Sequence, residues 1–249
     1  MPEFFAGTSG FAYSAWKPDF YPKNVASKNF LQYYATRLNA VEINYTFRQL
    51  PKASTLQNWV AQVEGARSAD APRDSDRRFL FACKAHQRIT HFNRLKESEF
   101  TEIFLKALEP LRDARRLGPV LFQLPPNLKV DVPLLAEFLA KLPEDIRFAF
   151  EFRNASWLTD EVYGLLEKHR VALCLAESEA LEIPKVITAD FVYARLRKEN
   201  YTTEDRLEIA RQVSGQLKRG LDIFAFFKHE ETPAGALYAE QLLSVNRRG

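Results

Sequence analysis

One stretch, residues 147–157 (RFAFEFRNASW), constrains the fold most. Its first half alternates as a β-strand does, so that the three phenylalanines face one way and Ala149, Glu151 and Arg153 face the other. A strand covered on both faces is normally apolar throughout, and burying a charge is costly unless the charge is paired or used. The stretch therefore predicts either a structural ion pair or the polar floor of an active site, at the C-terminal end of a strand.

The rest of the chain alternates between strand-like and helix-like segments about eight times. Strands are expected at 3–7, 40–44, 79–84, 119–124, 147–153, 171–176, 191–197 and 223–228. Helices are expected from an N-cap at Ser27, over 52–63, from Ser98, after a cap at Asp131, over 159–168, after a cap at Thr203 and over 235–244. This pattern predicts a (β/α)₈ TIM-type barrel, with a doubly wound open sheet as the alternative.

Length and composition agree with one α/β domain that spans residues 1–249. We interpret the polar stretch 64–77 as a long helix-to-strand loop rather than a linker, because a barrel-type strand follows it directly. The chain has 20 phenylalanines and a net charge of +3, which allows anionic ligands without demanding them. Cys83 and Cys174 lie in apolar runs and are interpreted as buried hydrophobic side chains in a reducing compartment. No signal peptide or membrane-spanning segment is recognisable, so we expect a cytoplasmic protein without a membrane partner.

The predicted strands begin with apolar residues and finish on groups that ionise or form hydrogen bonds. Because a TIM-type barrel carries its active site at the C-terminal strand ends, this gradient predicts a site there. The candidate catalytic residues are Glu42, Lys84, Glu151, Arg153 and Arg195, and Arg197 lies beside them. The candidate substrate-binding residues are Ser9, Asn44, His91, Gln123, Trp157, Glu177, Lys228 and His229.

Each candidate also has a structural interpretation. The glutamates are expected to neutralise Lys84, Arg153 and Arg195 if the barrel mouth is plugged by ion pairs. Tryptophans such as Trp16 and Trp157 more often pack in a core than stack on a ligand. His86, His91 and His229 fall in strand-to-helix loops and leave a divalent metal open, although no tight ligand spacing supports one, and the cofactor is unknown. Walker, dinucleotide-binding and serine-nucleophile signatures are absent.

Several motifs together resemble the YecE-like family, also described as domain of unknown function 72. They are Gly7-Thr-Ser-Gly-Phe11, Glu42-Ile-Asn44 with Thr46-Phe47, Phe81-Ala-Cys-Lys84 leading to Thr90-His91, Gly118-Pro-Val-Leu-Phe-Gln-Leu-Pro-Pro126, Glu151-Phe-Arg-Asn-Ala-Ser-Trp157 and Tyr193-Ala-Arg195. The resemblance implies a TIM-type barrel of one domain and brings no assigned reaction. The chain differs from the family pattern at Arg197-Lys198 and at Lys228-His229-Glu230.

Three functions follow from these features. The first is an enzyme, a hydrolase or isomerase, that clamps a phosphorylated or otherwise anionic small molecule with arginine and lysine and uses one glutamate as general acid or base. The second is a nucleic-acid-binding protein or phosphodiesterase, which uses the basic loop 85–96 together with Arg197, Lys198 and Tyr201. The third is a scaffold barrel without chemistry. The substrate, the metal dependence and the oligomeric state stay open.

Overall fold

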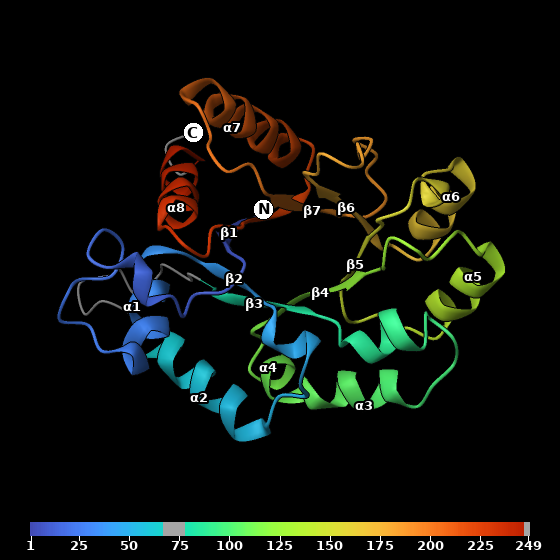
Figure 1. Ribbon diagram of the computed structural model, residues 1–249, viewed down its shortest axis with the longest axis horizontal. Helices are drawn as coiled ribbons and strands as arrows, with labels where there is room; N and C mark the ends of the chain where they lie inside the picture. Colours follow the sequence, from blue (N-terminus) through green and yellow to red (C-terminus); the bar gives the residue numbers. More distant parts are fainter. Residues whose placement is uncertain (67–77, 247–249) are drawn as a thin grey trace.

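The computed structural model describes residues 1–66 and 78–246. Eight parallel strands lie in the middle of the molecule, and the helices surround them (Figure 1). This arrangement confirms the predicted (β/α)₈ TIM-type barrel. The strands are β1 (Phe4–Thr8), β2 (Ala40–Ile43), β3 (Leu80–Lys84), β4 (Leu117–Gln123), β5 (Phe148–Glu151), β6 (Ala172–Ala176), β7 (Phe191–Leu196) and β8 (Asp222–Phe227).

The helices follow the strands on the outside of the barrel. They are α1 (Phe30–Arg37), α2 (Ala53–Glu64), α3 (Phe100–Ala107), α4 (Glu109–Asp113), α5 (Val132–Ala140), α6 (Asp160–Lys168), α7 (Thr203–Lys218) and α8 (Ala234–Asn246). The connection from β6 to β7, residues 177–190, contains no helix. The long loop 64–77 predicted from sequence lies for the most part outside the described residues.

The barrel is joined between its first two strands by side chains as well as by backbone. The sheet runs in the order β1-β8-β7-β6-β5-β4-β3-β2, and an isolated bridge between Ser9 and Glu42 connects its two ends. The Asn39 amide accepts from the backbone N–H of Ala6 and donates to the carbonyl of Phe4. The Tyr34 hydroxyl donates to the carbonyl of Ala40 and accepts from the N–H of Thr8. These contacts satisfy backbone groups that an open edge would expose.

Two sets of buried side chains fill the molecule. One set points into the barrel and mixes small with large residues, namely Ala40, Ala82, Ala149, Ala172, Phe191, Tyr193, Phe224 and Phe226. The other lies between strands and helices and includes Phe148 and Phe150. The predicted alternation within 147–153 is therefore confirmed, because Ala149 and the neighbouring Glu151 belong to the interior side. Both cysteines are free and buried, as expected.

Local details differ from three of the sequence expectations. Ser27 begins a 3-10 turn (Ser27–Asn29) instead of capping α1. Helix α7 is capped by Thr202 and not by Thr203, since the Thr202 side chain accepts from the N–H of Asp205 while the Asp205 carboxylate accepts from the N–H of Thr202. The single helix expected from Ser98 is two short ones, α3 and α4. The predicted cap at Asp131 is confirmed by its bond from the N–H of Leu134.

Within residues 1–66 and 78–246, no helix combines the length and the apolar character that crossing a bilayer requires.

A substitution at Gly7 tests how tightly β1 packs against β2. A Cβ at Gly7 would lie 1.8 Å from the carbonyl oxygen of Ala40, whereas a Cβ at the exposed Gly215 in α7 meets nothing within 4 Å. We expect Gly7→Ala to lower the free energy of unfolding by about 3 kcal/mol, because backbone atoms must move apart. Gly215→Ala, the matched control, is expected to raise it by about 0.5–1 kcal/mol through helix propensity. Urea unfolding measures both, and equal effects would contradict the packing described.

Candidate active site at the C-terminal mouth of the barrel

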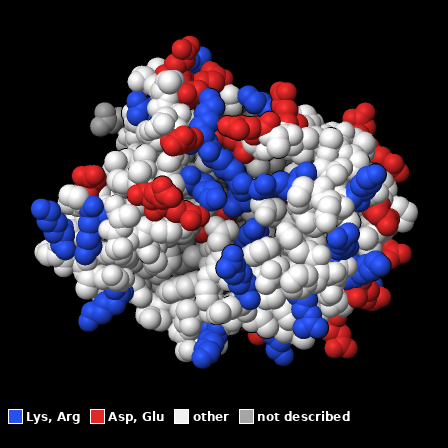
Figure 2. Space-filling model, viewed as in Figure 1, with Lys and Arg blue, Asp and Glu red and all other residues white. Residues whose placement is uncertain are grey.

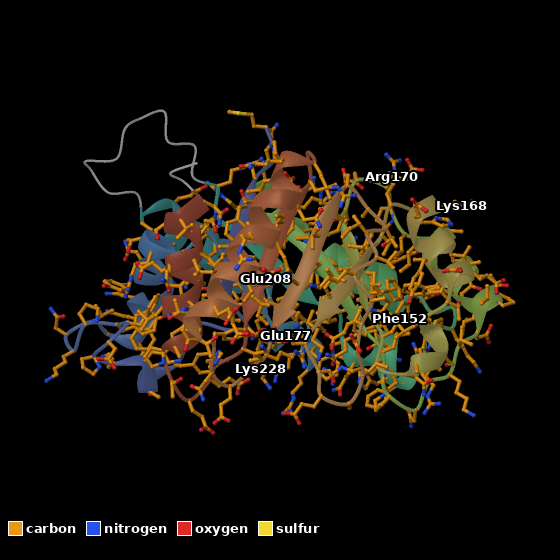
Figure 3. All side chains as sticks on the ribbon, turned by 90° about the horizontal axis from the view of Figure 1, so that it is seen from above. Phe152, Lys168, Arg170, Glu177, Glu208 and Lys228 are labelled. Atoms are coloured by element: carbon orange, nitrogen blue, oxygen red, sulfur yellow. The ribbon has the colours of Figure 1, made fainter. Side chains whose placement is uncertain are left out.

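The ionisable groups predicted for the strand ends meet at one end of the barrel. Glu177, which follows β6, and Lys228, which follows β8, lie at this end, whereas Lys168 and Arg170 lie at the opposite one (Figure 3). Lysine and arginine side chains gather near the middle of this face, and acidic groups lie directly beside them as well as at its edge (Figure 2). Charged side chains of both signs thus gather at the C-terminal mouth, the end where TIM-type barrels hold their sites.

Arg195 of β7 stands at the centre of the mouth between two carboxylates. Its Nη2 lies 2.7 Å from Oε1 of Glu42 on β2, and its Nη1 lies 2.6 Å from Oε2 of Glu151 on β5. The exposed fractions of the three side chains are only 4%, 0% and 1%. Charges so deeply buried are tolerated only when they are paired and hydrogen-bonded. Despite the desolvation, the two carboxylates hold the pKa of Arg195 above its ordinary value.

Glu42 has its remaining acceptor positions filled by neutral donors. The Ser9 hydroxyl and the Tyr193 hydroxyl each donate to it at 2.8 Å, to Oε1 and Oε2 respectively. The Asn44 amide lies 3.4 Å from the same Oε1. Ser9 is buried, so in this structure Ser9 and Asn44 orient Glu42. Glu42 is thus held in one orientation by groups from β1, β7 and its own strand end.

Glu151 is surrounded by guanidinium groups. Arg153 donates from Nε to its Oε1 at 2.6 Å, and Nη2 of Arg197 lies 3.4 Å from the same oxygen. Burial alone would raise the pKa of Glu151, but Arg195, Arg197 and Arg153 together lower it to about 2. The three guanidinium groups therefore favour the ionised form of Glu151.

Lys84, the last residue of β3, is arranged differently. Its Nζ donates to Oε1 of Gln123 at 2.8 Å and lies 3.9 Å from the centre of the Phe47 ring. Within the described part of the chain, no carboxylate lies within 4.0 Å of this amine. Burial and Arg195 lower the pKa of Lys84 to about 8, although Glu151 and Glu42 act in the opposite direction. The uncharged form of this amine is therefore more accessible than that of an exposed lysine.

Two further candidates lie on the rim of the mouth. His91 stands edge-on to the Phe47 ring at 5.0 Å, and burial together with Lys84 and Arg153 lowers its pKa. It belongs to a short π-helix (Arg88–Phe92) in the basic loop after β3, and such helices recur at functional sites. Glu177 accepts from the backbone N–H of Arg197 and from the Tyr201 hydroxyl, so it fixes the loop after β7.

Three predicted binding residues lie outside this cluster. Trp157 is completely buried, stacks on Phe152 at 5.0 Å and donates to the carbonyl of Leu128, so in this structure it packs between β5 and the helices. Lys228 is exposed and lies 4.0 Å from Glu230. His229 bonds the carbonyl of Glu199 and packs near Tyr238. None of these three contacts the ion pairs around Arg195.

Three residues of the mouth are not among the catalytic or substrate-binding residues predicted from the sequence. Tyr193 was quoted only within a family motif, yet it bonds Glu42 from two positions before Arg195, on the same interior side of β7. That period of two is the signal that identifies it. The sequence places Arg197 beside the catalytic candidates and in the candidate nucleic-acid surface, and in the structure its Nη2 lies 3.4 Å from Glu151. The Phe47 ring lies 3.9 Å from the Lys84 amine. Phe47 occurs in the family motif Thr46-Phe47, but its contact with Lys84 depends on the path of the loop after β2, which residue spacing does not give.

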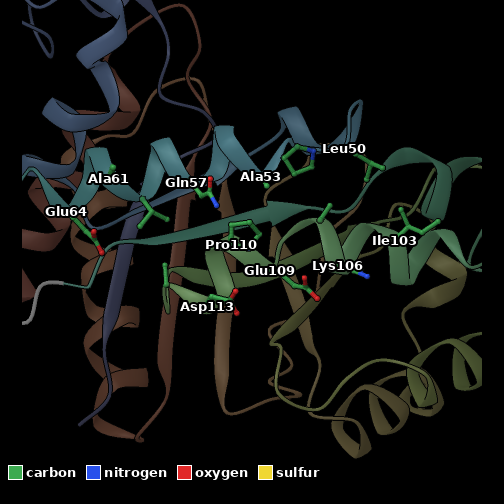
Figure 4. Close-up of a pocket in the computed structure, with 14 residues that line it drawn as sticks. Leu50, Ala53, Gln57, Ala61, Glu64, Ile103, Lys106, Glu109, Pro110 and Asp113 are labelled. Atoms are coloured by element: carbon green, nitrogen blue, oxygen red, sulfur yellow. The ribbon is translucent and has the colours of Figure 1, made fainter.

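A groove also lies outside the barrel. It measures about 760 Å³ and lies between α2 and the α3–α4 pair, outside the barrel (Figure 4). Its lining includes Val60, Ala61, Ile103, Lys106 and Pro110. This groove therefore does not coincide with the buried ion pairs at the barrel mouth. We place the candidate site at the mouth, because the buried charges and the pKa changes that mark functional sites are there.

Among the described residues, no group of three or more histidine, cysteine, aspartate or glutamate side chains is arranged to hold a metal ion. The two mouth glutamates are instead held by arginine.

Known proteins identify the family. A family model described as "Protein of unknown function DUF72" matches residues 5–248. The chain belongs to this family. The predicted resemblance to the YecE-like family is thereby confirmed, since the two names denote the same family.

Solved DUF72 structures share the barrel. A DUF72 family protein from Thermotoga maritima MSB8 is 24% identical and superposes with a TM-score of 0.78, covering 98% of this chain and 99% of that chain. One from Enterococcus faecalis V583 is 17% identical with a TM-score of 0.74, covering 99% and 98% respectively. At such identities these structures support the fold.

A curated relative is UPF0759 protein YunF of Bacillus subtilis, which is 28% identical over 150 residues, or 57% of this chain and 49% of the relative. The chain spans about half the length of this curated relative.

Replacing Arg195 tests the buried triad. We expect Arg195→Met to lower the free energy of unfolding by about 3–5 kcal/mol, because it leaves Glu42 and Glu151 buried without their shared cation. Adding Glu42→Gln and Glu151→Gln to it should recover part of the loss, since the unpaired charges are then gone. Arg211→Met, at a side chain 68% exposed in α7, is the control, with an expected change of about 0.5 kcal/mol or less. A triple variant less stable than Arg195→Met would contradict this interpretation.

The low pKa of Glu151 predicts that the stability of the fold depends on pH. Its pKa falls from an ordinary 4.5 to about 2 on folding, so its ionisation stabilises the fold fully above pH 4.5. That contribution is lost as the pH falls through the interval towards 2. Unfolding by urea at pH 6, 4 and 3 should therefore show a steeper loss of stability in the unmodified protein than in Glu151→Gln. Parallel loss in the two proteins would show that Glu151 is not the acid-sensitive group.

Proposed function

We propose that this DUF72 barrel is an enzyme that binds a phosphorylated or otherwise anionic small substrate at its C-terminal mouth. Its reaction class is that of a hydrolase or an isomerase. The residues that we assign to the site are Glu42, Lys84, Glu151, Arg153, Arg195 and Arg197, with Gln123 and His91 beside them.

The observation that carries the proposal is the imbalance of charge at the mouth. Four cationic side chains, Lys84, Arg153, Arg195 and Arg197, stand against two buried carboxylates, Glu42 and Glu151. A set of purely structural ion pairs would be expected to balance. Within this inner cluster, which does not include the rim carboxylate of Glu177, two positive charges are left over in a partly desolvated place, where an anion is bound more strongly than at an open surface.

The outer cations are available to a ligand. The side chains of Arg153 and Arg197 are 33% and 20% exposed, whereas Arg195 is 4% exposed. The Nε of Arg197 is buried without a hydrogen-bond partner among the described residues. Arginine presents two parallel N–H groups to phosphate or carboxylate, and lysine adds a point charge. In this proposal Arg153 and Arg197 clamp the anion with Lys84 beside them, and Arg195 with its two glutamates forms the rigid floor.

A nucleic-acid ligand is the second candidate, and exposed aromatic rings favour it. Phe92 is 69% exposed in the basic loop after β3, and Tyr45, 45% exposed, follows β2. Unpaired bases stack on such rings while basic groups contact the phosphates. Titrations of single-stranded DNA and RNA at several salt concentrations separate this candidate from a small ligand. Binding that weakens steeply with salt and is lost in Phe92→Ala supports it, and no binding near physiological salt removes it.

The third candidate is a scaffold barrel. The ion pairs around Arg195 agree with a mouth closed by mutual salt bridges, which this candidate predicts. The excess of cations distinguishes the anion-binding enzyme from the scaffold, because a scaffold gains nothing from unpaired positive charge. Anion binding at the mouth is therefore the deciding property.

We expect inorganic phosphate and pyrophosphate to bind at the mouth. Calorimetric titration should show binding in the unmodified protein and at least about tenfold weaker binding in Arg153→Met and in Arg197→Met, since each removes a charge-assisted contact. Lys168→Met is the matched control, because Lys168 is exposed at the opposite end of the barrel (Figure 3). Unchanged affinity in both arginine variants, or an equal loss in the control, would contradict the proposal.

A further inference from the structure

We propose that the amine of Lys84 is a nucleophile that forms a Schiff base with an aldehyde or ketone group of the substrate. The inference rests on the proposed function and narrows its substrate class to phosphorylated carbonyl compounds. It assigns different tasks to groups that lie side by side at the mouth: the arginines hold the phosphate, and the lysine reacts.

The contacts of Lys84 set it apart from its cationic neighbours. Arg153, Arg195 and Arg197 each lie within 4.0 Å of Glu151, and Arg195 also pairs with Glu42. Lys84 has no carboxylate within that distance in residues 1–66 and 78–246, and its hydrogen bond goes to the neutral amide of Gln123. A lysine that serves only as a counter-ion would be expected beside one of the two glutamates. The Gln123 oxygen and the Phe47 ring stabilise the ammonium form less than a carboxylate would, so the uncharged, nucleophilic amine is more accessible here than in an ion pair.

The surroundings of the amine are fixed. The ring of Phe47 lies 3.9 Å beneath Nζ, and the Thr46 hydroxyl donates to the carbonyl of Lys84 at 2.7 Å, which ties the end of β3 to the loop after β2. Burial and the positive charge of Arg195 and Arg197 oppose protonation of Lys84, and Glu151 and Glu42 offset them only in part. Desolvation beside other cations is a recognised way of activating a Schiff-base lysine.

The step balances without a further reactant. The lone pair of the neutral amine attacks the carbonyl carbon, a C–N bond forms, and the carbonyl oxygen leaves as water with the two amine protons. The imine then takes one proton from solvent and becomes a cationic iminium, which draws electrons from the neighbouring carbon. Isomerisation, or cleavage of the adjacent bond, is the chemistry that such a group supports.

Pyridoxal 5′-phosphate, an aldehyde with a phosphate, is a direct probe. The full chain is treated at pH 7 with an equimolar amount, reduced with borohydride and digested, and the modified lysines are quantified by mass spectrometry. We expect Lys84 to be modified at least about tenfold more than Lys168, which is exposed at the other end of the barrel, and inorganic phosphate to suppress the reaction.

The outcomes separate the inference from the proposal on which it depends. Modification of Lys84 no greater than that of Lys168, in a protein that binds inorganic phosphate at the mouth, would overturn the inference and leave the anion site standing. Equal modification of Lys84 by pyridoxal 5′-phosphate and by pyridoxal, with no suppression by phosphate, would support a nucleophilic lysine and overturn the anion site. If pyridoxal 5′-phosphate modifies Lys84 selectively, phosphate suppresses the reaction and pyridoxal does not react, the result supports the nucleophilic lysine and the anion site together.

Discussion

The mouth of this barrel depends on one buried guanidinium. Glu42 and Glu151 come from strands on opposite parts of the sheet, and both carboxylates are almost completely removed from water. Neither charge would be tolerated there without a partner, and Arg195 is placed so that one nitrogen reaches each of them. A pairing that crosses the barrel in this way fixes three strand ends relative to one another. It also explains why the polar groups of the sequence stand at one rim, above interior layers made of alanine and phenylalanine.

The outer cations of the mouth depend on the buried triad of Arg195, Glu42 and Glu151. With Glu42 saturated by Arg195, Tyr193 and Ser9, and Glu151 held ionised by three arginines, neither carboxylate is free to neutralise Lys84. The outer cations Arg153, Arg197 and Lys84 therefore remain underpaired at the surface of a rigid floor. Like charges kept this close cost stability, and ionisable groups perturbed in this way cluster at functional sites. The structural ion pairs and the proposed anion site are thus two parts of one arrangement, in which the buried triad positions the exposed cations.

Much of this was accessible from the sequence, because strand period and strand ends are local properties. The alternation of Phe148, Ala149, Phe150 and Glu151 alone predicted which side chains enter the barrel, and the strand ends gave Glu42, Lys84, Gln123, Glu151 and Arg195. The alternation of inward and outward side chains ends where the strand ends, however. Trp157 follows β5 by six positions and turns into the space between strands and helices, which no spacing rule reveals. The pairing of Arg195 with two glutamates, and the isolation of Lys84 from both, depend on distances across the barrel. The cap of α7 was misplaced by one residue because Thr202 and Thr203 are both good caps, and only the reciprocal bond with Asp205 distinguishes them.

The most direct measurement locates a bound anion. Crystals of the protein soaked in tungstate, a tetrahedral oxyanion with a strong anomalous signal, reveal the position of the anion independently of any assumed reaction. The charge imbalance around Arg195 predicts an anomalous peak within hydrogen-bonding distance of Arg153, Arg197 and Lys84, and loss of that peak from crystals of Arg197→Met. A mouth without tungstate in crystals that bind it elsewhere, for example beside Lys106 in the groove between α2 and α4, would contradict the central claim that the C-terminal mouth is an anion site.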